Sequence, residues 1–194
     1  GLGTGQSLTP IFDELIRRHE EGLSFDNVTI VNAYEYFPLK PGSSISSLQQ
    51  LKSRLLDKLG IPVGNILSPD ASVAQDDVQK ICRGYEQRIA ALGGIDILLL
   101  GIGRAGNVAT NEPGSGLTSR TRLILIDATS REEMTMSFGG QDAVPPCSIT
   151  LGMADIMAAR KIFLTAWGEE KAEIIEKTVE GPITDTIPAS FLQT

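Results

Sequence analysis

The sequence predicts an α/β protein with a doubly wound, mostly parallel sheet and helices on both faces. Helical and strand-like patterns alternate along the chain, and this order produces parallel strands that are joined by helices. Residues 95–102 (IDILLLGI) form an almost unbroken apolar run, as expected for a central strand that is buried on both faces. With 194 residues, the chain is long enough for one sizeable domain and short for two.

The expected helices are the segments in which apolar residues recur at helical spacing. In the first of them, Ile11, Leu15 and Ile16 form an apolar stripe. The second is expected to end at Gly60, since glycine is common just after the last residue of a helix. The predicted helices cover residues 10–21, 46–59, 71–92, 131–137, 152–159 and 169–179.

The expected strands are short and rich in β-branched and apolar residues. They cover residues 27–31, 95–102, 122–127, 148–151 and 161–167. Residues 1–5 (GLGTG) have the pattern of a strand end that runs into a glycine turn, so we expect a first strand, and a helix before it, to precede them. We predict a single domain over residues 1–194 with a Rossmann-like sheet.

Ligands of such folds bind beyond the carboxyl ends of the strands. The segments expected there are residues 3–10, 32–38, 103–116 and 168–171, and their composition is unusual for loops. They are therefore the candidate site segments.

Two of these segments have features of a phosphate site. Residues 3–7 (GTGQS) form a glycine turn with hydroxyl side chains, which can present backbone amides to an anion; the alternative is a tight strand-to-helix turn with an N-cap. The turn is neither a Walker A loop nor a complete dinucleotide fingerprint. Lys171 lies in the first turn of a helix, where the helix dipole disfavours a cation, so a bound anion would explain it. A solvated surface lysine is the alternative.

The segment after the central strand carries one carboxylate, Glu112. Pro113 favours an extended backbone at Glu112, which argues against a merely flexible loop. Residues 101–116 (GIGRAGNVATNEPGSG) and 119–122 (SRTR) resemble the signature of the glucosamine-6-phosphate deaminase/isomerase family. Agreement in the same order continues at residues 4–5 with Pro10, and at residues 35–36, 148–152, 168–171 and 179–182.

The resemblance implies conversion of glucosamine 6-phosphate and water to fructose 6-phosphate and ammonia, without an organic cofactor or a metal. This reaction requires general acid/base catalysis on a sugar that the site holds in position. Glu112 matches the glutamate that supports a catalytic histidine in this family. The positions that match the phosphate-holding residues of the family are Thr4, Gly5, Gln6, Ser7 and Lys171.

The acid/base positions depart from the family pattern. Tyr34 stands where the family has a proton-shuttling aspartate, Asn107 where it has the loop histidine, and Ala105 where it has an aspartate or threonine. A phenol with a pKa near ~10 is a poor base at neutral pH, and an amide cannot move a proton. Glu35 is one residue away from the expected base and is the candidate replacement. The chain's one histidine, His19, lies on the first helix and cannot replace the loop histidine.

Three functions remain open. The first is a glucosamine-6-phosphate deaminase/isomerase with weak or lost activity. The second is a non-catalytic sugar-phosphate-binding or regulatory protein, which the kept phosphate residues and altered acid/base residues favour. The third is a 6-phosphogluconolactonase, which also requires a loop histidine. The incomplete fingerprint argues against a dinucleotide-dependent dehydrogenase.

Charge and hydropathy narrow the set of partners. A net charge of −7 argues against a nucleic-acid partner, but it is compatible with a phosphorylated metabolite. The sequence has no run of 18 apolar residues and therefore predicts no membrane span, so we expect a cytoplasmic protein. Relatives in the family are often oligomers, so we expect self-association.

Overall fold

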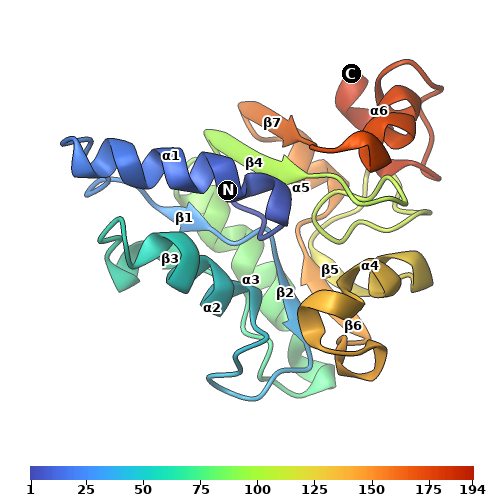
Figure 1. The fold of residues 1–194 in the computed structure, drawn as a ribbon. Helices are drawn as coiled ribbons and strands as arrows, with labels where there is room; N and C mark the ends of the chain where they lie inside the picture. Colours follow the sequence, from blue (N-terminus) through green and yellow to red (C-terminus); the bar gives the residue numbers. More distant parts are fainter.

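Parallel strands form the centre of the computed structural model, which describes residues 1–194 (Figure 1). The strands β1 (Ile30–Val31) and β3 (Ile66–Leu67) pair in parallel, and so do β4 (Ile97–Gly101) and β7 (Lys161–Thr165). Leu2 forms parallel bridges to both pairs, through Asn32 and Leu99, so the glycine turn starts from the middle of the sheet. The α/β class and the parallel strands are confirmed.

The β4 strand is the core strand that the sequence predicts. Leu98 and Leu100 are fully buried, and they pair in register with Ile162 and Leu164 of β7. The opposite face of β4 is only partly covered, since Ile97 is 50% exposed. The expectation that this strand is buried on both faces is therefore wrong at its start, where the second face is open at Ile97.

A second group of strands is antiparallel; the sequence patterns predicted two of its strands, at residues 122–127 and 148–151, but not the third strand or the antiparallel pairing. The strand β2 (Tyr34–Phe37) pairs with β6 (Cys147–Thr150), which also pairs with β5 (Arg122–Leu125). The expectation that residues 32–38 form a loop is wrong. All four residues of β2 are buried, so the strand has no alternation of polar and apolar side chains.

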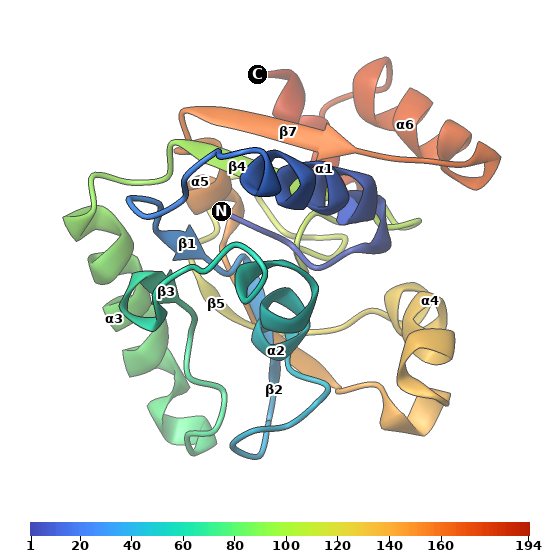
Figure 2. The ribbon, with the colours of Figure 1, turned by 60° about the vertical axis from the view of Figure 1, so that its left-hand side comes forward.

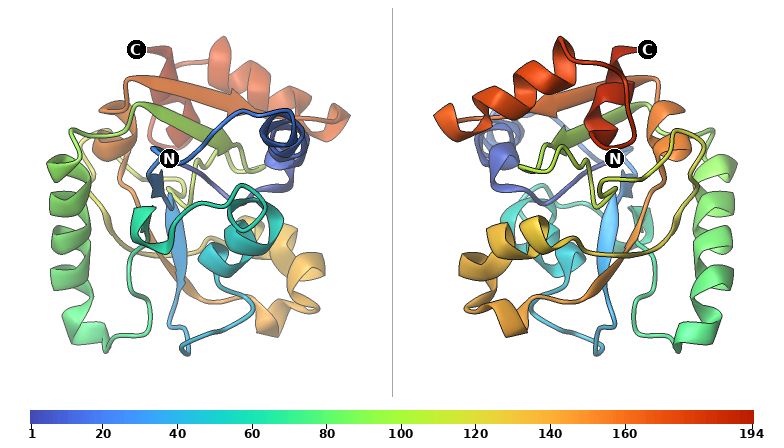
Figure 3. Two further views of the ribbon diagram at one scale, coloured as in Figure 1. Left: turned by 90° about the vertical axis from the view of Figure 1, so that its left-hand side faces the viewer. Right: turned by 90° about the vertical axis from the view of Figure 1, so that its right-hand side faces the viewer.

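The helices lie on both sides of the strands (Figure 3). One side carries α3 (Val78–Ala91) and α5 (Met153–Met157), and the other carries α1 (Thr9–Glu20), α2 (Ser47–Leu51) and α4 (Ala128–Phe138). A π-helical turn, Lys52–Leu56, extends α2, and α6 (Ala172–Val179) lies next to β7 (Figure 2). The expected helix over residues 71–92 starts later, at Val78, after a 3-10 turn.

Buried apolar side chains hold α1 and α2 together beneath the glycine turn. Leu8 and Phe12 pack in one cluster with Leu51, Leu55 and Leu56, all of them 2% exposed or less. This packing fixes where the first helix begins, and so it fixes the position of the turn before it. No helix is long and apolar enough to cross a membrane.

Candidate ligand-binding site

A cavity of about 1190 Å³ opens beyond the carboxyl ends of β4 and β7. This is where a ligand site is expected in a sheet of this kind. Four parts of the chain form most of its walls: residues 3–10 except Leu8, residues 100–109 in part, α4 from Ser130 to Phe138 in part, and residues 166–171 in part. Tyr34, Tyr36, Gln50 and Arg54 complete the walls.

The glycine turn forms part of the cavity wall, since all four of its predicted site residues line the cavity: Thr4, Gly5, Gln6 and Ser7. The turn leads into a 3-10 turn, Gln6–Leu8, that continues as α1. The first amides of such a helix have no intrahelical acceptor and are suited to bind an anion. The turn is held from behind, because the indole Nε1 of Trp167 donates to the Ser7 carbonyl at 2.7 Å.

Gly101 explains how the turn approaches so closely to β4. A Cβ atom at this position would collide with the hydroxyl of Ser7. The first glycine of the Gly-x-Gly pattern therefore leaves room for the Ser7 side chain, and the turn and the loop after β4 form one wall.

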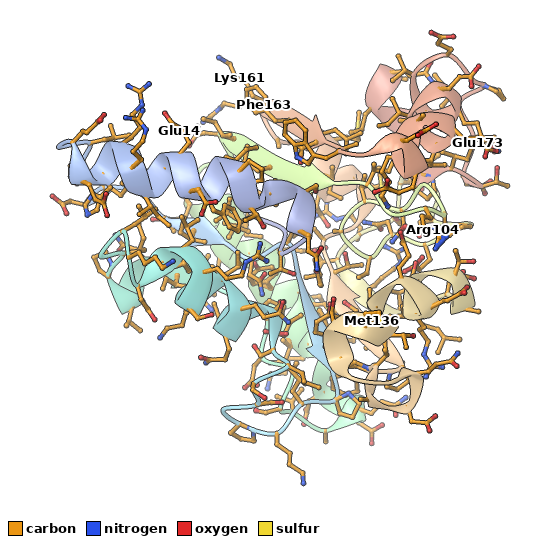
Figure 4. All side chains as sticks on the ribbon, in the orientation of Figure 1. Glu14, Arg104, Met136, Lys161, Phe163 and Glu173 are labelled. Atoms are coloured by element: carbon orange, nitrogen blue, oxygen red, sulfur yellow. The ribbon has the colours of Figure 1, made fainter.

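Lys171 reaches the same cavity but is paired with a carboxylate. Its Nζ lies 2.8 Å from Oε1 of Glu133 on α4, and Oε2 of Glu133 accepts the Arg104 amide at 3.1 Å. The two side chains are only 19% and 22% exposed. The alternative of a solvated surface lysine is thus wrong. Figure 4 shows Arg104 between α4 and α6.

Tyr34 lines the cavity with its hydroxyl next to the glycine turn. The hydroxyls of Tyr34 and Thr4 form a short hydrogen bond, and the Tyr34 ring packs edge-on against Tyr36 with centroids 5.6 Å apart. Burial raises the pKa of Tyr34 above its ordinary value. The phenol is therefore neutral near pH 7, and it can donate a hydrogen bond but is a poor base.

Asn107 also lines the cavity, and its side chain is 5% exposed. Its Oδ1 atom is buried and has no hydrogen-bond partner in the protein. Gly103 leaves the room for this side chain, since a Cβ there would overlap Oδ1. Ala105 does not line the cavity. His19 is far from this wall as well; its Nδ1 is 2.8 Å from the Leu23 carbonyl at the end of α1.

Glu112 lies behind the cavity wall rather than on it. It is 3% exposed, its Oε2 accepts the Ser130 hydroxyl at 2.7 Å, and its Oε1 has no partner. Burial raises the pKa of the Glu112 carboxyl to about 7, although the Ser130 hydrogen bond opposes the rise. Because Ser130 is on α4, Glu112 positions the helix that forms one wall.

Glu35, the candidate replacement base, is not at the cavity. Its carboxylate accepts hydrogen bonds from the amides of Ser47 and Leu48, at 2.7 and 3.1 Å, at the start of α2. It also accepts the Ser46 hydroxyl at 2.6 Å and its neighbour's amide, Tyr36, at 2.9 Å. The expectation that Glu35 serves as the base is wrong, because neighbouring residues of a strand point to opposite faces and Tyr34 faces the cavity.

The raised pKa of Glu112 predicts how stability depends on pH. Between pH 4.5, the ordinary pKa, and about 7, the folded protein holds a proton that the unfolded chain has lost. The free energy of unfolding should therefore fall as the pH rises through this window, by roughly 3 kcal/mol at about 1.36 kcal/mol per pKa unit. Urea unfolding of wild type and Glu112→Gln at several pH values measures this. If both proteins show the same slope, Glu112 is not responsible.

The fold and the cavity define an α/β protein with a glycine turn beside a cavity at the carboxyl edge of a parallel sheet. Comparison with known proteins is consistent with this class. The model of the glucosamine-6-phosphate isomerase/6-phosphogluconolactonase family matches residues 1–194, and the chain belongs to this family.

Relatives with assigned names cover the whole chain. It is 54% identical over 194 residues to a glucosamine-6-phosphate deaminase-like protein of Bacteroides thetaiotaomicron, but spans only 29% of that protein's length. It is 40% identical to the glucosamine-6-phosphate deaminase of Arthrobacter sp. (strain FB24), of which it spans 74%.

Solved structures agree. A monomeric glucosamine-6-phosphate deaminase superposes with a TM-score of 0.94 at 36% identity, over 99% of this chain and 79% of the other. The 6-phosphogluconolactonase of Trypanosoma cruzi has a TM-score of 0.77 at 22% identity, over 100% and 76% of the two chains, and shares the fold.

Proposed function

We propose that this protein binds an amino-sugar phosphate such as glucosamine 6-phosphate and deaminates it weakly or not at all. One observation carries the proposal. The turn and the lysine that match the family's phosphate-holding residues meet in one cavity, whereas the acid/base positions that face this cavity are Tyr34 and Asn107. Apart from Glu112, the side chains that match the family pattern are the phosphate-holding ones, and the side chains that depart from it stand at proton-transfer positions.

The chemistry shows why these changes matter. Isomerisation and loss of ammonia require a group that accepts and returns a proton beside the sugar, and such groups each contribute about 10²–10⁴-fold in rate. Tyr34 is held neutral, and Asn107 can only form hydrogen bonds. Glu133 is the carboxylate paired with Lys171. Its two oxygens already accept hydrogen bonds, one from Lys171 and one from the Arg104 amide.

A 6-phosphogluconolactonase is the second candidate, since lactonases share the fold. The family resemblance implies a loop histidine for that reaction also, and Asn107 stands in its place. The lactonase function is therefore supported no better than the deaminase function. Because the proposed ligand is a metabolite, we propose that the protein acts in the cytoplasm.

Calorimetric titration with glucosamine 6-phosphate tests the binding part of the proposal. Wild type should bind this compound, and Lys171→Ala should bind it about tenfold less tightly, since a charge-assisted hydrogen bond contributes roughly 1.5–3 kcal/mol and the Glu133 pair offsets some of it. Lys177→Ala is the matched control, because Lys177 is also paired with a glutamate, Glu173, but lies outside the cavity. Unchanged affinity in Lys171→Ala would remove Lys171 from the site.

A further inference from the structure

Arg54 is a cavity-lining cation that the sequence patterns did not single out. Its NH1 donates to the Thr4 carbonyl at 2.7 Å, and its NH2 donates to the Thr9 hydroxyl at 2.6 Å. The guanidinium also lies 5.4 Å from the centre of the Phe12 ring. The side chain is therefore held in place directly beside the glycine turn.

The position of Arg54 follows from the π-helical turn Lys52–Leu56. Leu51, Leu55 and Leu56 are buried in the core beneath α1, so they fix this turn from its inner side. Arg54 lies between them in sequence and faces the cavity. Short π-helical segments are frequently found at functional sites.

Arg54 differs from Lys171, the other cation at the cavity, in that no carboxylate pairs with it. Lys171 is neutralised by Glu133, at 2.8 Å. Arg54 takes part in none of the ion pairs of the structure; its acceptors are a neutral carbonyl and a neutral hydroxyl. It is therefore the positive charge at the cavity that no carboxylate balances.

We propose that Arg54 is a phosphate ligand of this cavity and determines its preference for phosphorylated sugars. A guanidinium has five N–H donors in a planar fork that matches a phosphate, and only two of the five are used within the protein. The remaining donors and the turn amides bind the phosphate oxygens together. Lys171 can join them while it stays paired with Glu133, because its ammonium has three donors and this pair uses one of them. The inference rests on the proposed function, since it assigns the cation that holds the ligand's phosphate.

Titration of Arg54→Gln, Arg54→Lys and the control Arg17→Gln with glucosamine 6-phosphate tests the proposal. Arg17 is a surface arginine of α1 that pairs with Glu14 and Glu21, outside the cavity. Arg54→Gln should weaken binding about 10- to 100-fold, Arg54→Lys should weaken it less, and Arg17→Gln should leave it unchanged. Thermal unfolding of each variant shows that it is folded.

A second readout separates phosphate binding from simple bracing of the turn. Affinity for glucosamine 6-phosphate should fall with added salt in wild type and in Arg54→Lys, and clearly less steeply in Arg54→Gln, because one charge no longer meets the phosphate. Arg54→Gln with wild-type affinity, or with weaker binding but an unchanged salt dependence, overturns the inference and leaves the proposed function standing. Absence of binding to wild type overturns both.

Discussion

The triple variant Tyr34→Asp/Ala105→Asp/Asn107→His should release ammonia from glucosamine 6-phosphate at least a hundredfold faster than wild type. It restores the groups that the family pattern places at these positions. Tyr34 and Asn107 already line the cavity next to the glycine turn, so the new side chains would meet a bound sugar. One positioned acid/base group typically contributes about 10²–10⁴-fold, and the variant introduces more than one.

The control for this gain is Tyr34→Asn/Ala105→Asn, with Asn107 kept. Its side chains match the introduced aspartates in size but cannot exchange protons. It should bind glucosamine 6-phosphate without releasing ammonia above the wild-type rate. If the triple variant folds, binds the sugar phosphate and shows no gain, then the three altered positions do not account for weak turnover.

Glu35→Ala should lower the free energy of unfolding by about 3 kcal/mol or more. The carboxylate of Glu35 accepts hydrogen bonds from four donors, among them the amides of Ser47 and Leu48 at the start of α2. Glu35 is 4% exposed, so removal of the carboxylate leaves buried donors without acceptors, each of which costs roughly 1–3 kcal/mol.

Urea unfolding measures this loss, with Glu132→Ala as the control. Glu132 is exposed on α4, and alanine suits a helix, so its replacement should change stability by less than about 0.5 kcal/mol. A loss below about 1 kcal/mol for Glu35→Ala would contradict the structural role assigned to this carboxylate.

The parts of the fold that could be predicted are those with a local signal. The apolar run of β4 and the helical spacing at the start of α1 identify these elements directly. The strand β2 has no such signal, because its four residues are all buried and one of them is a glutamate. That glutamate is tolerated only because amides from α2, about a dozen residues further along the chain, satisfy it.

In the candidate site too, only residues with a local sequence signal could be predicted. The glycine turn and Lys171 follow from sequence, because each has an unusual composition for its place at a strand end or helix start. Arg54 and Glu133 could not be found in this way, since an arginine and a glutamate on helices are ordinary residues. Only the tertiary fold brings the π-helical turn after α2 and the helix α4 to the same cavity.

One sample of the wild-type protein can test both parts of the proposed function, the retained binding and the weak or lost turnover. Calorimetric titration with glucosamine 6-phosphate should give saturable binding. The same sample, assayed for ammonia under saturating substrate, should turn over at about 0.1 s⁻¹ or less, a hundredfold below the enzyme median of about 10 s⁻¹. Turnover at about 10 s⁻¹ or more would contradict the account, and so would the absence of binding.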